Sequence, residues 1–177
     1  HLVLRRQRQM CIRDRRWEVT RPKIFETNRF VADKFAPACM QGPRIVNWYK
    51  GVAAGFGGDP NYIKTPEISE DCLYLNIWVP TNLDHKEKIP VLIYIHGGSN
   101  RAGWSFEPNY IGKNLSKKGV IVITVSYRLG VFGFYSHPYL DASNFALLDL
   151  IESLNWVKEN IAKVGGCLLY TSPSPRD

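Results

Sequence analysis

Two short runs of apolar residues constrain the fold of this chain more than any other feature. Residues 91–95 read VLIYI and residues 120–127 read VIVITVSY, and both runs are rich in β-branched side chains. Unbroken apolar runs of this length are typical of strands that helices cover on both faces. Neither run approaches the roughly 18 apolar residues that a membrane-spanning helix needs. The sequence therefore predicts buried strands and no membrane span.

A third strand and a long helix accompany these runs. Residues 73–79 alternate between two faces and stop at Pro80, which predicts a strand. Residues 144–164 carry apolar side chains at steps of three and four, which predicts a helix ended by two glycines. Its predicted buried stripe comprises Leu147, Ile151, Leu154, Val157 and Ile161.

The remaining segments show weaker patterns. Residues 107–118 predict a short helix that ends at Gly119. Residues 16–65 are interrupted by proline and glycine, which predicts loops and short edge segments. Taken with the strands and the long helix, these segments predict an α/β protein built on a layered sheet.

The two ends of the chain differ from its interior. Residues 5–15 read RRQRQMCIRDR and residues 167–177 read CLLYTSPSPRD. Both match translations of transposase-type sequencing-library adapters. We therefore predict that residues 1–15 and 167–177 are adapter-derived and that residues 16–166 are native, and we exclude the ends from the fold prediction. The alternative is a genuine basic arm and a genuine Ser/Pro tail.

These boundaries change the charge and the cysteine count. The whole chain carries a formal charge of +7 and four cysteines. Residues 1–15 hold five Arg and one Asp, and residues 167–177 carry no net charge, so residues 16–166 carry +3. Their cysteines are Cys39 and Cys72. The arguments for a nucleic-acid partner and for a metal site therefore lose most of their support. A nucleic-acid binder would require a genuine arm at residues 5–15.

Residues 70–80, EDCLYLNIWVP, resemble the second signature of the type-B carboxylesterase/lipase family at every position. The resemblance covers essentially all of residues 16–166. It implies the N-terminal part of an α/β-hydrolase, with a central, mostly parallel sheet flanked by helices, in an incomplete domain. Similar motifs follow the family's order at residues 16–17, 35–39, 95–98, 127–134, 144–149 and 156–157.

The resemblance gives a role to the glycines that follow the first apolar run. In α/β-hydrolases this loop supplies backbone N–H groups to an oxyanion hole. The implied catalytic residues are Gly97, Gly98 and Ser99, with the N–H groups of Gly98 and Ser99 as donors. The family usually has Gly or Ala and then an aromatic residue where Ser99 and Asn100 stand, so Asn100 is a substrate-binding candidate. Tyr62, where cholinesterases place a Trp for a cationic group, is another.

The resemblance also implies structural bonds. Cys39 and Cys72 match the family's first disulfide, which implies an oxidising compartment and a secreted or periplasmic protein. Two reduced cysteines are the alternative. Two pairs of opposite charge match buried ion pairs of the family, and we predict a structural role for both. These pairs are Arg128–Asp149 and Arg16–Glu70.

The family's chemistry needs a Ser in Gly-x-Ser-x-Gly, a carboxylate and a His, and this chain has no such pentapeptide in register. We therefore predict a fragment, inactive alone, of a serine esterase that hydrolyses small-molecule carboxylic esters through an acyl-enzyme. The resemblance implies neither a metal nor an organic cofactor and leaves the oligomeric state open. The alternative function is a non-catalytic, cholinesterase-like adhesion or binding protein. A nucleotide-binding domain lacks support because no Gly-x-Gly-x-x-Gly or Walker pattern occurs.

Overall fold

The computed structural model describes residues 2–5, 16–21, 32–81 and 88–168. In this part of the chain a five-stranded sheet has the order β1-β4-β6-β5-β7, and a two-stranded sheet pairs β2 with β3. The strands are β1 (Leu2–Arg5), β2 (Ala38–Cys39), β3 (Ile68–Ser69), β4 (Tyr74–Trp78), β5 (Ile89–Ile95), β6 (Ile121–Val125) and β7 (Gly166–Cys167).

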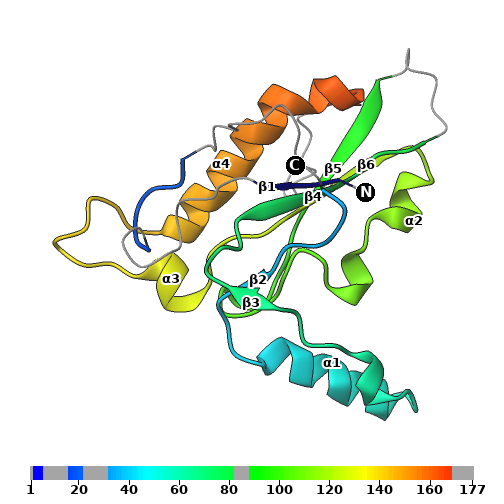
Figure 1. Cartoon of the computed structure of the whole chain (residues 1–177), viewed down its shortest axis with the longest axis horizontal. Coiled ribbons are helices and arrows are strands. Elements are labelled where there is room, and N and C mark those ends of the chain that lie inside the picture. Colours follow the sequence, from blue (N-terminus) through cyan, green and yellow to red (C-terminus); the bar gives the residue numbers. More distant parts are fainter. Residues whose placement is uncertain (1, 6–15, 22–31, 82–87, 169–177) are drawn as a thin grey trace, which may run out of the picture.

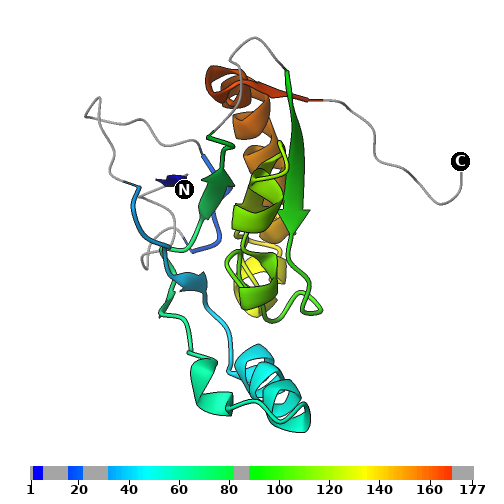
Figure 2. The same cartoon turned by 90° about the vertical axis from the view of Figure 1, so that its right-hand side faces the viewer.

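Helices flank the main sheet and extend beyond one end of it. The long helix α4 runs along one face of the strands and α2 lies on the other side (Figure 1). The helix α1 lies apart, beyond β2 and β3, at the end toward which β5 points (Figure 2). The α-helices are α1 (Arg44–Gly55), α2 (Lys113–Ser116), α3 (Gly130–Phe134) and α4 (Phe145–Asn160), with short 3-10 turns at η1 (Pro60–Tyr62), η2 (Pro108–Tyr110) and η3 (Ile161–Val164).

Strand pairing gives the sheet a mixed character. β6 pairs with β5 in parallel, from Val91 opposite Ile121 to Ile95 opposite Val125. β5 also pairs in parallel with β7, whereas β4 is antiparallel to both β6 and β1. β1 belongs to residues 1–15, which are predicted to be adapter-derived.

The two apolar runs are buried to different degrees. All five residues of β6 are buried, as predicted, because this strand lies between two neighbours and under helices on both faces. Residues 91–95 form the predicted strand within β5, but their predicted burial is wrong, since Leu92 and Ile95 are 45% and 43% exposed. The physical reason is that β7, the outer neighbour of β5 among the described residues, pairs with it over two residues alone.

The long helix was predicted correctly, but most of its buried face was not. Leu147, Ile151 and Leu154 are 52%, 53% and 45% exposed, whereas Val157 and Ile161 are buried as expected. The buried face turns instead toward Phe145, Ala146, Asp149, Ser153 and Val157. The spacing of apolar residues could not predict this face, because two of its residues, Asp149 and Ser153, are polar and are buried through hydrogen bonds.

A 12-residue helix, α1, occupies part of the segment predicted to be loops. Pro43 precedes its first turn, a position where the missing N–H of proline costs nothing. Gly51 lies inside the helix, although glycine there argues against a helix in a sequence. Tertiary packing overrides that preference, since the buried Val46 and Tyr49 join Ala38 and Trp104 in a core cluster.

Two features are absent from the described residues. No helix there combines the length and the apolar character needed to cross a bilayer. Nor do the described His, Cys, Asp and Glu side chains gather in threes where a metal ion could be held.

Candidate active site at the loop after β5

A tight loop follows the end of β5, as the sequence predicts, and its backbone requires glycine. Gly98 has φ +114°, and a Cβ on it would lie 1.8 Å from the carbonyl oxygen of Ala102. Ser99 and Asn100 also have positive φ, at 57° and 59°. The Gly98 carbonyl accepts hydrogen bonds from the N–H groups of Arg101 (3.1 Å) and Ala102 (3.2 Å). Three consecutive left-handed residues therefore form a compact turn.

The turn leaves backbone donors without a carbonyl partner. Within the described part of the chain, this holds for the N–H groups of Gly98 and Ser99 and equally for that of Asn100. Gly98 is half-buried and Ser99 is exposed, so both N–H groups can be reached from solvent. Two neighbouring free donors beside a pocket are therefore available to an anion or to a polarised carbonyl oxygen.

His96, at the start of the loop, supports the framework. It is 2% exposed, and its Nδ1–H donates to the Gly97 carbonyl at 2.9 Å. Its ring stacks on Tyr127 at a centroid distance of 4.5 Å, and the Tyr127 hydroxyl donates to the His96 carbonyl at 2.8 Å. Burial lowers the pKa of His96, so that the neutral ring is favoured. His96 therefore packs within the loop and stabilises its backbone.

Three pockets meet at Ser99. Their volumes are about 240, 260 and 410 Å³, and Ser99 lines all three. The first is bounded by α4, the second by α1 and the third by α3. Gly98 lines the α1 pocket and Asn100 lines the other two. The predicted loop residues therefore lie where a ligand could place different substituents in different pockets.

Tyr62, the second substrate-binding candidate, does not line these three pockets. It is the last residue of η1 and is 83% exposed. The aromatic residues that do line the α1 pocket are Trp48, Tyr49 and Tyr110. Sequence analysis missed Trp48 and Tyr49 because it did not predict α1.

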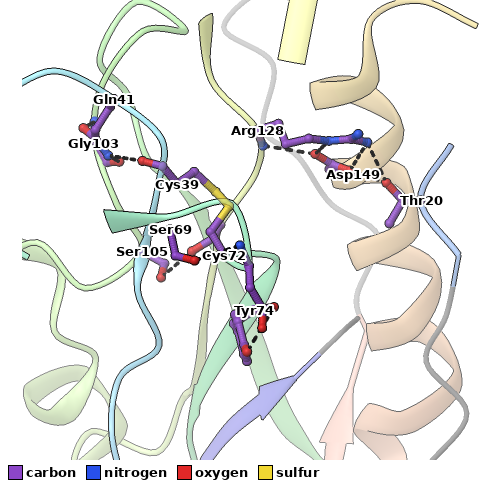
Figure 3. Close-up of a disulfide and its surroundings, with 12 residues drawn as sticks. Thr20, Cys39, Gln41, Ser69, Cys72, Tyr74, Gly103, Ser105, Arg128 and Asp149 are labelled. Carbon is purple, nitrogen blue, oxygen red and sulfur yellow. Dashed lines mark hydrogen bonds and ion pairs between the residues drawn. A yellow bond between two sulfur atoms is a disulfide. The ribbon is translucent and has the colours of Figure 1, made fainter. Parts of the chain in front are cut away.

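A disulfide joins Cys39 to Cys72 across the base of the segment that carries α1 (Figure 3). Both cysteines are buried, at 3% and 1% exposure, and their Cα atoms are 4.9 Å apart. A sequence separation of 33 residues corresponds to a chain-entropy stabilisation of about 4 kcal/mol. The bond therefore ties α1 and one pocket wall to the start of β4.

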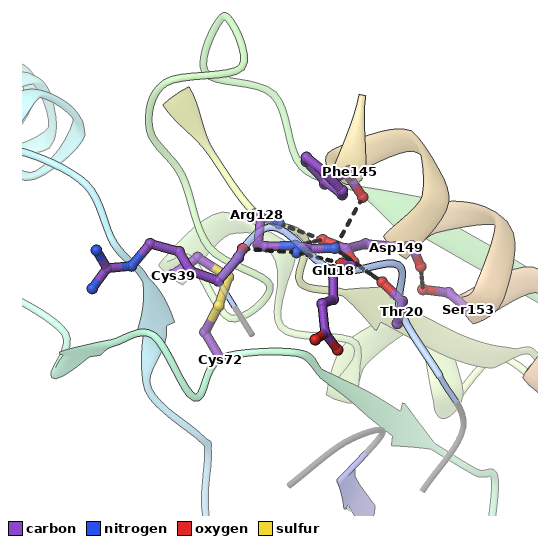
Figure 4. Close-up of polar contacts among 9 residues, drawn as sticks. Glu18, Thr20, Cys39, Cys72, Arg128, Phe145, Asp149 and Ser153 are labelled. Atoms are coloured by element: carbon purple, nitrogen blue, oxygen red, sulfur yellow. Dashed lines mark hydrogen bonds and ion pairs between the residues drawn. A yellow bond between two sulfur atoms is a disulfide. The ribbon is translucent and has the colours of Figure 1, made fainter. Parts of the chain in front are cut away.

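Arg128 and Asp149 form a fully buried ion pair, with 2% and 0% of their side chains exposed. The Nε and Nη2 atoms of Arg128 each lie 2.8 Å from a carboxylate oxygen of Asp149, so the pair is bidentate (Figure 4). Arg128 Nη1 also donates to the carbonyls of Arg16 and Glu18. Thr20 hydrogen-bonds to the same carboxylate. The pair therefore joins the end of β6, α4 and residues 16–20.

The second predicted pair is formed but is not fully buried. Arg16 and Glu70 contact each other through two pairs of atoms, with Nε to Oε2 at 2.9 Å. Their side chains are 33% and 22% exposed. Because solvent screens such a pair, its contribution to stability is small.

Comparison with known proteins decides the family. The sequence profile described as "Carboxylesterase family" matches residues 9–167. This chain belongs to the carboxylesterase family. The match begins inside the segment interpreted as adapter-derived and ends at Cys167.

Several carboxylesterases resemble the chain over most of its length. Fumonisin B1 esterase from Sphingopyxis macrogoltabida is 36% identical over 160 residues, which cover 86% of this chain and 27% of that protein. Liver carboxylesterase from Sus scrofa is 43% identical over 134 residues, covering 75% of this chain and 23% of the relative. Para-nitrobenzyl esterase from Bacillus subtilis strain 168 is 43% identical over 112 residues, covering 60% and 22%. The chain thus spans about a quarter of these relatives.

Solved structures confirm the α/β-hydrolase fold. A thermophilic PNB esterase superposes with a TM-score of 0.73 at 34% identity, covering 86% of this carboxylesterase chain and 30% of the esterase. A second PNB esterase structure gives a TM-score of 0.74 at 33% identity, with the same coverage. The predicted fold class is therefore confirmed, with the described elements matching one part of a larger domain.

Proposed function

We propose that this chain is the N-terminal part of a serine carboxylesterase and that Gly97, Gly98 and Ser99 form its oxyanion loop. The observation that carries the proposal is the pair of unused N–H groups at Gly98 and Ser99, next to three pockets, in a member of the carboxylesterase family. The substrates would be small-molecule carboxylic esters. Asn100, which lines two of the pockets, would contact the substrate.

The chemistry follows from the charge that develops during ester cleavage. When a nucleophile attacks the ester carbonyl, its oxygen becomes an oxyanion, and two fixed N–H donors stabilise that charge more than the neutral ground state. Losing one such donor typically costs about 3–4 kcal/mol of transition-state stabilisation. The Ser nucleophile, its carboxylate and its His would belong to parts of the enzyme beyond these motifs, and the chain alone would be inactive.

A chimera tests the proposal. Residues 16–166 replace the matching segment of the Bacillus subtilis para-nitrobenzyl esterase, and hydrolysis of p-nitrophenyl acetate is measured. We expect the chimera to be active and Gly98→Ala to lower its kcat about 100-fold or more. Gly42→Ala is the matched control, because nothing lies within 4 Å of the added Cβ.

Two results would count against the proposal. Equal activity of the Gly98→Ala and Gly42→Ala chimeras would remove the oxyanion role. Turnover by the isolated chain above the background of free histidine would contradict its predicted inactivity. In the longer gene, Gly or Ala at the serine position of the Gly-x-Ser-x-Gly motif would favour the non-catalytic adhesion or binding function instead.

We also propose that the enzyme is secreted or periplasmic. The support is the buried disulfide, a bond that persists mainly in oxidising compartments. Thiol labelling of the protein in its source cells tests this. Labelling of Cys39 or Cys72 without prior reduction would contradict it.

A further inference from the structure

We propose that Gln41 is a positioning residue that closes the neck of the loop formed by residues 96–103, the "oxyanion loop", and so connects the disulfide to the two free donors. Glu107 links the next residue, Trp104, to Tyr49 of α1. The name of the loop rests on the proposed function, whereas the closure of its neck rests on contacts within the chain alone.

The two ends of the oxyanion loop touch each other. Gly103 has φ +117°, and a Cβ there would lie 2.4 Å from Nδ1 of His96 and 2.6 Å from the Gly97 carbonyl oxygen. Such distances leave no room for any side chain at Gly103. The loop is therefore closed at a neck where its first two residues contact its last.

One amide side chain satisfies both backbone groups of Gly103. The Gly103 N–H donates to Oε1 of Gln41 at 2.7 Å, and Nε2 of Gln41 donates to the Gly103 carbonyl at 2.7 Å. Nε2 also donates to the carbonyl of Cys39 at 3.1 Å, which holds the amide against the disulfide (Figure 3). Because Gln41 is two residues from Cys39, the disulfide limits the movement of this clamp.

The next residue is anchored from α1. Glu107 is 5% exposed, its Oε1 accepts from the Trp104 N–H at 3.0 Å, and its Oε2 accepts from the Tyr49 hydroxyl at 2.6 Å. Burial and the neighbouring carboxylate raise the pKa of Tyr49, which keeps the hydroxyl protonated as a donor. Gly103 and Trp104 are thus both bound to the segment that the disulfide closes.

The loop needs such a clamp because its backbone is unfavourable. Ser99 and Asn100 hold positive φ, a conformation that persists for residues other than glycine only where surrounding contacts enforce it. Without the contacts at the neck, Ser99 and Asn100 would leave their positive φ, and the N–H groups of Gly98 and Ser99 would no longer point to one position. Gln41 therefore acts on the reaction through the backbone of the oxyanion loop rather than by touching the substrate.

Amide hydrogen exchange on the isolated chain tests the clamp. The reporters are the N–H groups of Arg101, Ala102 and Gly130, which bond to Gly98 and Asn100 rather than to Gln41. Gln41→Ala should raise their exchange rates about tenfold, since it removes two hydrogen bonds at the neck. The amides of β6 should keep their rates. Asn47→Ala, which removes an exposed amide side chain from the same disulfide-closed segment, is the matched control.

Gln41→Glu is a second variant that keeps the size of the side chain. It keeps an acceptor for the Gly103 N–H but places a carboxylate oxygen against the carbonyls of Gly103 and Cys39, so the reporters should accelerate at least as much as in Gln41→Ala. The Gln41→Glu variant also tests the positioning role of Gln41 if Gln41→Ala does not fold. Unchanged reporters in both variants would overturn the proposal, and so would equal acceleration in β6, because that would indicate global destabilisation.

The chimera separates the clamp from the proposed function. There, Gln41→Ala should lower kcat about tenfold and leave KM nearly unchanged, as expected when donors used mainly in the transition state are displaced. An equal rise in KM would overturn the positioning role. If Gly98→Ala left kcat intact while the exchange pattern held, the oxyanion function would fail and the closed neck would stand.

Discussion

At the scale of single residues, the site depends on backbone atoms and on neutral side chains. Gly98 and Gly103 are restricted to glycine by carbonyl oxygens and by His96, which would meet any added Cβ. His96 itself is neutral, stacked and hydrogen-bonded within the loop. Such a residue makes the stability of the loop dependent on pH, even though we assign it no role in catalysis.

The buried His96 predicts loss of stability in mild acid. Burial lowers its pKa below the ordinary value of 6.5, while the carboxylate of Glu107 and the Gly97 carbonyl partly oppose that shift. Below pH 6.5 the unfolded chain therefore binds a proton that the folded chain does not, so the free energy of unfolding falls as pH falls. The slope from one such group is at most about 1.4 kcal/mol per pH unit.

Urea unfolding between pH 5 and 8 measures this effect. We expect His96→Asn to flatten the slope below pH 6.5 relative to the unmodified chain. His137→Asn is the control, because His137 lies in an exposed turn. Identical slopes for the unmodified chain and His96→Asn would show that His96 titrates alike in both states.

At the scale of elements, buried polar contacts decide how α4 sits on the sheet. The helix turns Asp149 inward to meet Arg128, and Leu147, Ile151 and Leu154 consequently lie half-exposed. The spacing of apolar residues predicted the helix, and the alternation of residues 73–79 predicted a strand. The spacing did not predict which face of the helix is buried, because it takes no account of a buried ion pair.

The two ion pairs should differ strongly in their energetic contribution. Asp149→Asn leaves the Arg128 charge buried without its counter-charge, which should cost about 3–5 kcal/mol of unfolding free energy. Glu70→Gln removes the equivalent charge from a partly exposed pair, and it should cost less than about 1 kcal/mol. Both are measured by urea unfolding at pH 7, and equal losses would contradict the difference in burial.

At the scale of the whole molecule, the disulfide-closed segment is a separate wall that two side-chain anchors join to the sheet. Cys39–Cys72 closes the segment. Gln41 contacts Gly103, the last residue of the oxyanion loop, and Tyr49 contacts Glu107 beyond it. A local change in this segment can therefore reach the donors at the end of β5. The N-terminal residues also affect the whole sheet, because β1 pairs with β4 and adds a strand at that edge.

Deletion of residues 1–15 tests whether that segment is native. If it is adapter-derived, as we propose, residues 16–177 should unfold with a free energy within about 0.5 kcal/mol of that of the full chain, the range typical of changes without a structural role. Binding to heparin should also fall, since five Arg are removed. A loss of several kcal/mol would indicate that β1 is an evolved strand of the sheet.

Local patterns in the sequence were sufficient for the α/β class and the position of the glycine loop. The family, its α/β-hydrolase fold and the residues of the disulfide and ion pairs came from the resemblance of contiguous motifs to a known family. Tertiary structure alone determined that α1 forms, that α4 turns its polar face inward and that Tyr62 lies away from the pockets. It also brought Gln41 to Gly103 across 62 positions of sequence. Such contacts depend on which surfaces fold against each other, and no local spacing encodes that choice.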